Sequence, residues 1–183
     1  MTLIIVDYDD TLLCSSHIRT SSTTVVPEDI VEVATSVITF LEEAMKHGTV
    51  VIVTNGELAW VHLTVNKYMP TVAPILQRLR VISARDAYFD HHPLSPYKWK
   101  YHAFEALLHE VQPSGVLSVG DSLVERKAIL QLGSIRKGIL TKSVKFVDAP
   151  TPQQLRCQLI AVTSQLAYLC TVNSNLDLQL TIR

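Results

Sequence analysis

The sequence predicts an α/β protein, in which helices cover both faces of one mostly parallel β-sheet. Short apolar runs rich in β-branched residues alternate along the chain with longer segments of helical periodicity, a pattern typical of strand–helix repeats. The composition is 48% hydrophobic and 18% charged, as expected for a folded globular chain. The 183 residues fit one domain with a sizeable core, so we expect residues 1–183 to form a single unit.

The first half of the chain begins with a buried strand at residues 3–6. Residues 12–26, rich in serine and threonine, are expected to form a flap-like loop. A helix then begins at Pro27, because proline and the two acidic residues that follow suit a first turn, and Gly48 ends it. Next we expect a strand at 49–53, a helix at about 57–69 that Pro70 breaks, a short strand at 79–83 and a loop at 86–96.

The second half continues the alternation. We expect a helix at 99–111, a strand at 115–119, a helix at 123–132 that stops at Gly133, strands at 135–140 and 144–147, and, within residues 150–183, a C-terminal helix at 152–169 and an edge strand at 176–182. The regular order predicts a three-layer α/β/α, Rossmann-like sheet. The last strand would offer an open edge for pairing, which leaves a homo-oligomer open.

Charge and composition narrow the classes of partner. The net charge of −1 predicts no general affinity for nucleic acid or anionic membranes. No segment has the length of a membrane span and the N-terminus lacks a basic signal region, so we expect a cytoplasmic protein. The three cysteines, Cys14, Cys157 and Cys170, lack C-x-x-C spacing and are expected to be reduced, unreactive thiols.

The end of the first strand carries the strongest functional signal, Asp7-Tyr8-Asp9-Asp10-Thr11. Side chains i and i+2 of a strand point the same way, so Asp7 and Asp9 would face one site if the strand pattern persists. Two such carboxylates repel each other and need a cation, a shared proton or solvent. The alternative is an ordinary polar turn, because aspartate and threonine are common turn residues.

Polar residues follow two further strands and begin one helix. Thr54 and Asn55 end the second strand, Asp121 follows the fourth, and Lys98 and Lys100 begin the helix before it. The carboxyl ends of parallel strands meet at one edge of the sheet, so these residues are expected to gather there with Asp7 and Asp9. As a set they form a more specific signal than the Asp-x-Asp-x-Thr motif alone.

This set of residues suits phosphoryl transfer. Asp7 would attack phosphorus to give an aspartyl-phosphate. Mg²⁺ would cancel charge, held by Asp7, Asp121 and the backbone carbonyl of Asp9. The side chain of Asp9 would protonate the leaving group and later activate water.

The transferred phosphate needs its own ligands. Thr54, Asn55 and the backbone N–H groups that follow would begin a helix and bind the phosphate there, and a lysine ammonium would complete the anion site.

The four segments VDYDDT, VIVTN, PYKWK and VLSVGDSLVE together resemble the motifs of the haloacid dehalogenase superfamily of aspartate-nucleophile phosphatases, from Leu3 to about Leu132. They are also similar to a less characterised eukaryotic branch with a DWDDTLLPS-like first motif, a WK pair and GDSxxER. This chain has Tyr8 in place of the tryptophan and Cys14-Ser15 in place of Pro-Ser. The resemblance implies a phosphatase or phosphotransferase rather than a dehalogenase, because Asp9 is present, and it favours Lys100 over Lys98.

The resemblance also bears on two further features, the cap domain and the role of Glu125. The intervals from Thr11 to Thr54 and from Thr54 to Lys98 leave no room for a cap domain. By resemblance, capless members often act on bulky or macromolecular phosphates or borrow a lid from a neighbouring subunit. Glu125 is either a ligand of a metal-linked water or an ordinary exposed glutamate.

Three functions follow as hypotheses. The first is a Mg²⁺-dependent phosphomonoester phosphatase that acts on a phosphorylated substrate of unknown identity. The second is a phosphotransferase of the same chemistry, and the third is a catalytically weak domain used for binding or assembly. For Trp60 and Trp99 we expect packing in or near the core, and for the pair His91-His92 a solvated loop position rather than a metal site.

Overall fold

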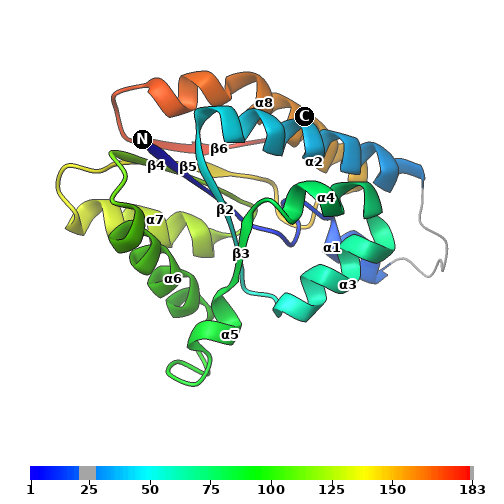
Figure 1. Ribbon diagram of the computed structural model, residues 1–183, viewed down its shortest axis with the longest axis horizontal. Coiled ribbons are helices and arrows are strands. Elements are labelled where there is room, and N and C mark those ends of the chain that lie inside the picture. The colour runs from blue at the N-terminus through cyan, green and yellow to red at the C-terminus, as the bar shows by residue number, and fades with distance from the viewer. Residues whose placement is uncertain (21–27, 182–183) are drawn as a thin grey trace.

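The computed structural model describes residues 1–20 and 28–181, and its centre is a six-stranded sheet whose strand pairs are all parallel (Figure 1). The strand order across the sheet is β3-β2-β1-β4-β5-β6. The strands are β1 Thr2–Val6, β2 Gly48–Thr54, β3 Arg80–Ser83, β4 Gly115–Gly120, β5 Leu140–Lys145 and β6 Leu176–Gln179. The predicted parallel sheet is therefore confirmed, and the edge strand expected near the C-terminus is β6.

Helices cover both faces of this sheet, which confirms the predicted three-layer arrangement. In Figure 1, α2 and α8 lie along one face, and α6 and α7 lie on the other. The helices are α1 Ser15–Thr20, α2 Glu28–His47, α3 Leu58–Tyr68, α4 Ala73–Leu76 with the preceding 3₁₀ turn Pro70–Val72, α5 Ala84–Tyr88, α6 Pro96–Val111, α7 Leu123–Ile135 and α8 Pro152–Thr171. Among the described residues, no additional cap domain interrupts this order.

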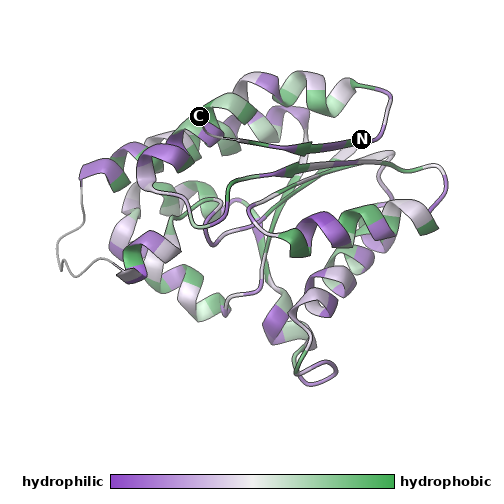
Figure 2. Cartoon of the chain, turned by 180° about the vertical axis from the view of Figure 1, so that it is seen from behind, coloured by the Kyte–Doolittle hydropathy of each residue, from purple (hydrophilic) through white to green (hydrophobic). Residues whose placement is uncertain are grey.

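Two hydrophobic cores follow from the alternation of side chains along the strands. In β1, Ile4 and Val6 belong to the core beneath α2 and α8, whereas Leu3 and Ile5 belong to the core beneath α6 and α7. All four side chains are almost completely buried. A strand buried on both faces reads as a continuous apolar run, which is why this segment was recognisable in the sequence. Figure 2 shows the complementary pattern on the helices, where hydrophobic and hydrophilic bands alternate.

The flap-like loop expected over residues 12–26 is wrong for residues 15–20, which form α1. Asp10 holds the start of this helix: its Oδ1 accepts the backbone N–H of Ser16 at 2.9 Å and its Oδ2 accepts the Ser16 hydroxyl. A single turn of this length has no helical periodicity to detect, so only the capping contact could reveal it. Residues 21–26 of the expected loop lie outside the described residues.

The strands expected at 135–140 and 144–147 are also wrong, because one strand, β5, spans Leu140–Lys145. Gly133 does not end α7, which continues to Ile135. A Cβ at this glycine would lie 2.4 Å from Thr141 Oγ1, so the glycine permits close contact between α7 and β5 rather than a helix stop. The buried strand was hard to recognise because it contains Thr141, Lys142, Ser143 and Lys145.

The loop expected at 86–96 is shorter than predicted, because Ala84–Tyr88 form α5. The hydroxyl of Ser83 accepts the backbone N–H of Asp86 at 2.9 Å and so caps this helix. Within the described parts of the chain, each helix is too short or too polar to serve as a membrane span.

The order of the strands places a switch point at β1. From β1 the chain moves outward through β2 and β3, then returns to β4 on the other side of β1 and continues outward through β5 and β6. The connections on the two sides of β1 therefore leave in opposite directions. In open α/β sheets, ligands bind at the carboxyl edge of such a switch point. Asp7, which follows β1 directly, lies there.

Candidate functional site

Asp7 lies at the carboxyl end of β1 in contact with a buried lysine. Its backbone N–H donates to the Val119 carbonyl at 2.9 Å, which continues the pairing of β1 with β4. Its Oδ1 lies 2.6 Å from Nζ of Lys100, and the side chains of both residues are at least 93% buried. Carboxylate oxygens of Asp7, Asp121 and Glu125 all lie within 4.8 Å of one another. Three sequence motifs that are far apart in the chain thus meet at one edge of the sheet.

Glu125 fixes the position of Lys100. One of its oxygens, Oε1, accepts from Lys100 Nζ, and the other, Oε2, accepts from the backbone N–H of Ser122 at 3.1 Å and from the Ser122 hydroxyl. The bond from the Ser122 backbone N–H to Glu125 is one half of a capping box at the start of α7, in which the Ser122 side chain also accepts from a backbone N–H of the helix. Glu125 is 4% exposed, so the hypothesis of an ordinary exposed glutamate is wrong. Its oxygens hold the lysine between two carboxylates.

The charges of this cluster do not balance. Lys100 contacts the carboxylates of Asp7 and Glu125, and that of Asp121 lies beside them, so these four groups carry two negative charges in excess when all three carboxylates are ionised. Burial, opposed by Lys100 and reinforced by Glu125, raises the pKa of Asp7 to about 7. Burial together with Asp7 and Glu125 raises the pKa of Asp121 to about 8. Burial is the largest cause of both shifts, and neighbouring carboxylates add to it.

A divalent cation fits this imbalance. Its two positive charges equal the excess, and the available donors are carboxylate oxygens, which hard cations prefer. Asp7 and Asp121 are the side chains best placed to hold it, because both oxygens of Glu125 already have hydrogen-bond donors. Although burial disfavours the charged ammonium, Asp7 and Glu125 hold the pKa of Lys100 above its ordinary value, so Lys100 stays a cation beside the site.

The side chain of Asp9 has different neighbours from that of Asp7. Its Oδ1 accepts the indole N–H of Trp60 at 2.9 Å and lies 3.6 Å from the Arg19 guanidinium. Its Oδ2 accepts from the Thr54 hydroxyl at 3.4 Å. These partners hold the Asp9 carboxylate on the side of β2 and α3. The Asp9 carboxylate is therefore engaged outside the cluster of Asp7, Asp121 and Glu125.

Thr54 and Asn55 lie at the end of β2, where the sequence predicts an anion site, and two of the backbone N–H groups that follow have partners within the protein. The N–H of Gly56 donates to Thr54 Oγ1 at 2.8 Å, and the N–H of Leu58, the first residue of α3, donates to Asp86 Oδ2 at 3.0 Å. A carboxylate of the protein itself thus occupies this helix N-terminus. Asn55 donates to the Pro96 carbonyl at 3.1 Å and so ties β2 to the start of α6.

Of the two candidate lysines, only Lys100 reaches the site. Lys98 is exposed, whereas Lys100 is 1% exposed and contacts Asp7 and Glu125. Two residues that are two positions apart on a helix point in different directions. Helix α6 can therefore present only one of these two lysines to the sheet edge. Cys14 is fully buried, and burial raises the pKa of its thiol, in keeping with an unreactive cysteine.

Lys145 is a site residue that the motifs did not predict. It ends β5, is 3% exposed, and its Nζ donates to the backbone carbonyl of Asp121 at 2.7 Å, to the Phe146 carbonyl at 3.0 Å and to Asp148 Oδ1 at 2.9 Å. It therefore holds the loop that carries Asp121. In the sequence it is simply a lysine near the end of a strand, and the residue bounds predicted for that strand were wrong.

Ser83 was also missed. Its hydroxyl donates to the Gly56 carbonyl at 2.8 Å while it caps α5, so it links the end of β3 to the loop after Thr54. A serine before a short helix gives no sign of this second contact.

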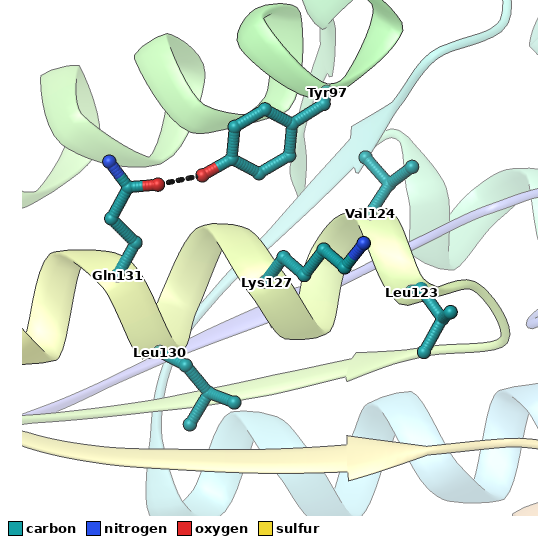
Figure 3. A pocket seen from close by; sticks show the side chains of 6 residues that line it. All are labelled: Tyr97, Leu123, Val124, Lys127, Leu130 and Gln131. Atoms are coloured by element: carbon teal, nitrogen blue, oxygen red, sulfur yellow. Dashed lines mark hydrogen bonds between the residues drawn. The ribbon is translucent and has the colours of Figure 1, made fainter.

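A shallow groove of about 570 Å³ lies beside the site rather than over it (Figure 3). Figure 3 shows Tyr97 of α6 reaching across to Gln131 of α7, to which it is hydrogen-bonded. Within the part of the chain that the structure describes, none of the candidate site residues lines this groove; its lining residues are Tyr97, Leu123, Val124, Lys127, Leu130 and Gln131. The candidate site is instead defined by the cluster of buried charges.

Comparison of the chain with family models, with curated proteins and with solved structures found no match.

Proposed function

We propose that this protein is a divalent-cation-dependent phosphomonoester phosphatase of the haloacid dehalogenase type, with Asp7 as its nucleophile and Mg²⁺ as its metal. The observation that carries the proposal is the buried cluster at the carboxyl edge of β1. There, one carboxylate contacts a lysine ammonium and lies beside a second carboxylate, Asp121, whose pKa is raised to about 8. A phosphate group and a divalent cation are complementary to this mixture of charges.

In the first half of the reaction, the Asp7 carboxylate attacks phosphorus. A P–O bond forms between Asp7 and phosphorus, the ester P–O bond breaks, and the ester oxygen leaves with the electron pair of that bond. Asp9 supplies the proton that this oxygen takes up. The ammonium of Lys100, 2.6 Å from Asp7, offsets negative charge on the transferred group. Mg²⁺ held by Asp7 and Asp121 would supply further charge neutralisation.

In the second half, a water molecule attacks the phosphorus of the aspartyl-phosphate. The Asp9 carboxylate takes a proton from this water, and the bond between Asp7 and phosphorus breaks to release inorganic phosphate and free Asp7. Asp9 is thereby returned to its protonated form for the next cycle. The hydroxyl of Thr54, which contacts Asp9 Oδ2 at 3.4 Å, would bind the phosphate oxygens.

The proposal is tested with p-nitrophenyl phosphate in the presence of Mg²⁺, in the presence of EDTA, and with Asp7→Asn. We expect turnover that depends on the metal and that Asp7→Asn abolishes, because an amide oxygen is a far weaker nucleophile than a carboxylate. Asp90→Asn, at an exposed position outside the cluster, serves as the matched control and should keep full activity.

Two outcomes would contradict the proposal. Turnover by Asp7→Asn at the rate of the unchanged protein would show that Asp7 is not the nucleophile. No turnover of any phosphate ester, together with no thermal stabilisation by Mg²⁺, would favour a binding or assembly role instead.

A further inference from the structure

Helix α3 holds the loop after β1 through two side-chain hydrogen bonds. The indole N–H of Trp60 donates to Asp9 Oδ1 at 2.9 Å, and one helical turn later the Thr64 hydroxyl is 2.8 Å from the hydroxyl of Tyr8. Tyr8 and Thr64 are both fully buried, and Thr64 also donates to the Trp60 carbonyl at 2.7 Å. The position of Asp9 is therefore set by α3 as well as by the loop that follows β1.

Of the three groups that contact the Asp9 carboxylate, Trp60 has the strongest hold. The Arg19 guanidinium is 3.6 Å away on a side chain that is 60% exposed, so solvent screens this ion pair. The Thr54 hydroxyl is 3.4 Å away, at the limit of a hydrogen bond. The Trp60 bond, at 2.9 Å and partly buried, is the shortest of the three contacts.

An indole N–H can donate but cannot accept a hydrogen bond. The bond from Trp60 engages Oδ1, and a proton of the Asp9 carboxyl group can be carried on Oδ2, the oxygen that Trp60 does not contact. This oxygen contacts Thr54, and a Cβ built on Gly56 would lie 3.0 Å from it. Oδ2 thus faces the loop at the end of β2, on which the phosphate is expected.

We propose that Trp60 is a positioning residue for acid catalysis: its indole N–H occupies Oδ1 of Asp9 and leaves Oδ2 as the oxygen that delivers the proton to the leaving group. This inference rests on the proposed function, in which Asp9 protonates the ester oxygen as the P–O bond breaks. Trp60 contacts Asp9 and acts through it. Its effect on the reaction rate should therefore be largest for esters whose leaving group needs a proton.

The test compares Trp60→Phe with Trp99→Phe on two esters. Trp99 is a matched control because it also donates its indole N–H, to the His92 carbonyl at 2.8 Å, and is largely buried. Phenylalanine keeps the aromatic ring and removes the donor. The esters are p-nitrophenyl phosphate, whose leaving group is stable as an anion, and glycerol phosphate, whose alkoxide needs a proton.

For Trp60→Phe we expect kcat/KM on glycerol phosphate to fall about 10-fold, the size associated with a hydrogen bond to a charged group. On p-nitrophenyl phosphate the loss should be much smaller. Asp9→Ala should show the same preference more strongly, and Trp99→Phe should show neither loss. Equal losses on both esters for Trp60→Phe would mark a merely structural role and overturn the inference.

A second readout does not depend on activity. The two indole N–H groups give separate signals in a ¹H–¹⁵N spectrum, and the two Trp→Phe variants assign them. We expect Asp9→Ala to shift the Trp60 signal and to leave the Trp99 signal in place.

If neither signal moves, the hydrogen bond is absent in solution and the inference is wrong whatever the enzyme does. If the Trp60 signal moves but neither ester is hydrolysed in the presence of Mg²⁺, the proposed function fails, and the role of Trp60 in acid catalysis fails with it.

Discussion

At the scale of single residues, Asp121 shows the effect of crowding several carboxyl groups at one edge of the sheet. Its pKa is raised to about 8 by burial and by three nearby carboxylates, those of Asp7, Glu125 and Asp10. A carboxyl group whose pKa is raised in the folded state stabilises the fold fully below its ordinary pKa, and this stability is lost as the pH rises through the folded value. For Asp121 the loss extends from about pH 4 to about pH 8.

Asp121→Asn should therefore raise the melting temperature of the metal-free protein at about pH 8, and change it much less at about pH 5. The amide removes one of the repelling charges at the higher pH, where the unchanged protein carries it. Thermal unfolding in EDTA at the two pH values measures this. Added Mg²⁺ should stabilise the unchanged protein, and more so at the higher pH, but should no longer stabilise Asp121→Asn. A melting temperature that Mg²⁺ raises equally in both proteins would show that Asp121 is not a ligand.

Lys145 acts on the same loop from its backbone side. Lys145→Met should raise the Mg²⁺ concentration needed for half-maximal activity by about 10-fold, because groups that orient metal ligands typically affect affinity by this much. The Asp121 carbonyl would lose a donor that lies 2.7 Å away. Lys98→Met, at an exposed lysine, is the control and should leave the Mg²⁺ requirement unchanged. An unchanged requirement in Lys145→Met would mean that the loop keeps its position without this lysine.

The sequence identified Asp7, Lys100 and Asp121 as site residues because each ends a strand or begins a helix within a recognisable motif. The structure brings these three together. Lys145 and Trp60 could not be identified in this way, because their importance lies in contacts between elements that are distant in the chain. A single lysine or tryptophan has no spacing that predicts such a contact.

At the scale of elements, the capping boxes of α7 and α8 allow the effect of a helix cap on protein stability to be distinguished from its effect on turnover. Ser122 caps α7 and Thr151 caps α8 with the same pattern of reciprocal hydrogen bonds. Ser122→Ala and Thr151→Ala should each lower the free energy of unfolding by about 1 kcal/mol. Only Ser122→Ala should also lower turnover, because Ser122 holds the glutamate that fixes Lys100.

Chemical denaturation and kinetics on the same two samples measure both effects. Equal loss of turnover in the two variants would mean that turnover follows the general stability of the protein and not the position of Glu125.

The elements that the sequence misplaced have a common physical cause. The long helices and the apolar strands have a clear period, and the structure contains them with small shifts at their ends. Helix α1 is a single capped turn and β5 is a buried strand of largely polar residues, so neither has the expected pattern. Both are specified by contacts with the rest of the fold, such as the close approach of Gly133 to Thr141.

At the scale of the whole molecule, the sheet order explains why the motifs meet. Because β1 lies between β2 and β4, the ends of these three strands present Asp7, Thr54 and Asp121 side by side at the switch point. Helix α6 leads into β4 and brings Lys100 to the same edge. The parallel order was predictable from the alternation of elements, whereas the depth to which Lys100 and Glu125 are buried was not, since burial depends on how α6 and α7 pack together.

The most direct measurement is the detection of a phosphoryl group on Asp7 itself. The protein is mixed with Mg²⁺ and p-nitrophenyl phosphate, quenched in acid during turnover, digested and analysed by mass spectrometry, with Asp7→Asn treated in parallel. We expect the peptide that contains Asp7 to gain the mass of one phosphoryl group, and the Asp7→Asn peptide to gain none. Turnover without any phosphorylated Asp7 peptide, or a phosphoryl group found on another residue, would contradict the assignment of Asp7 as the nucleophile.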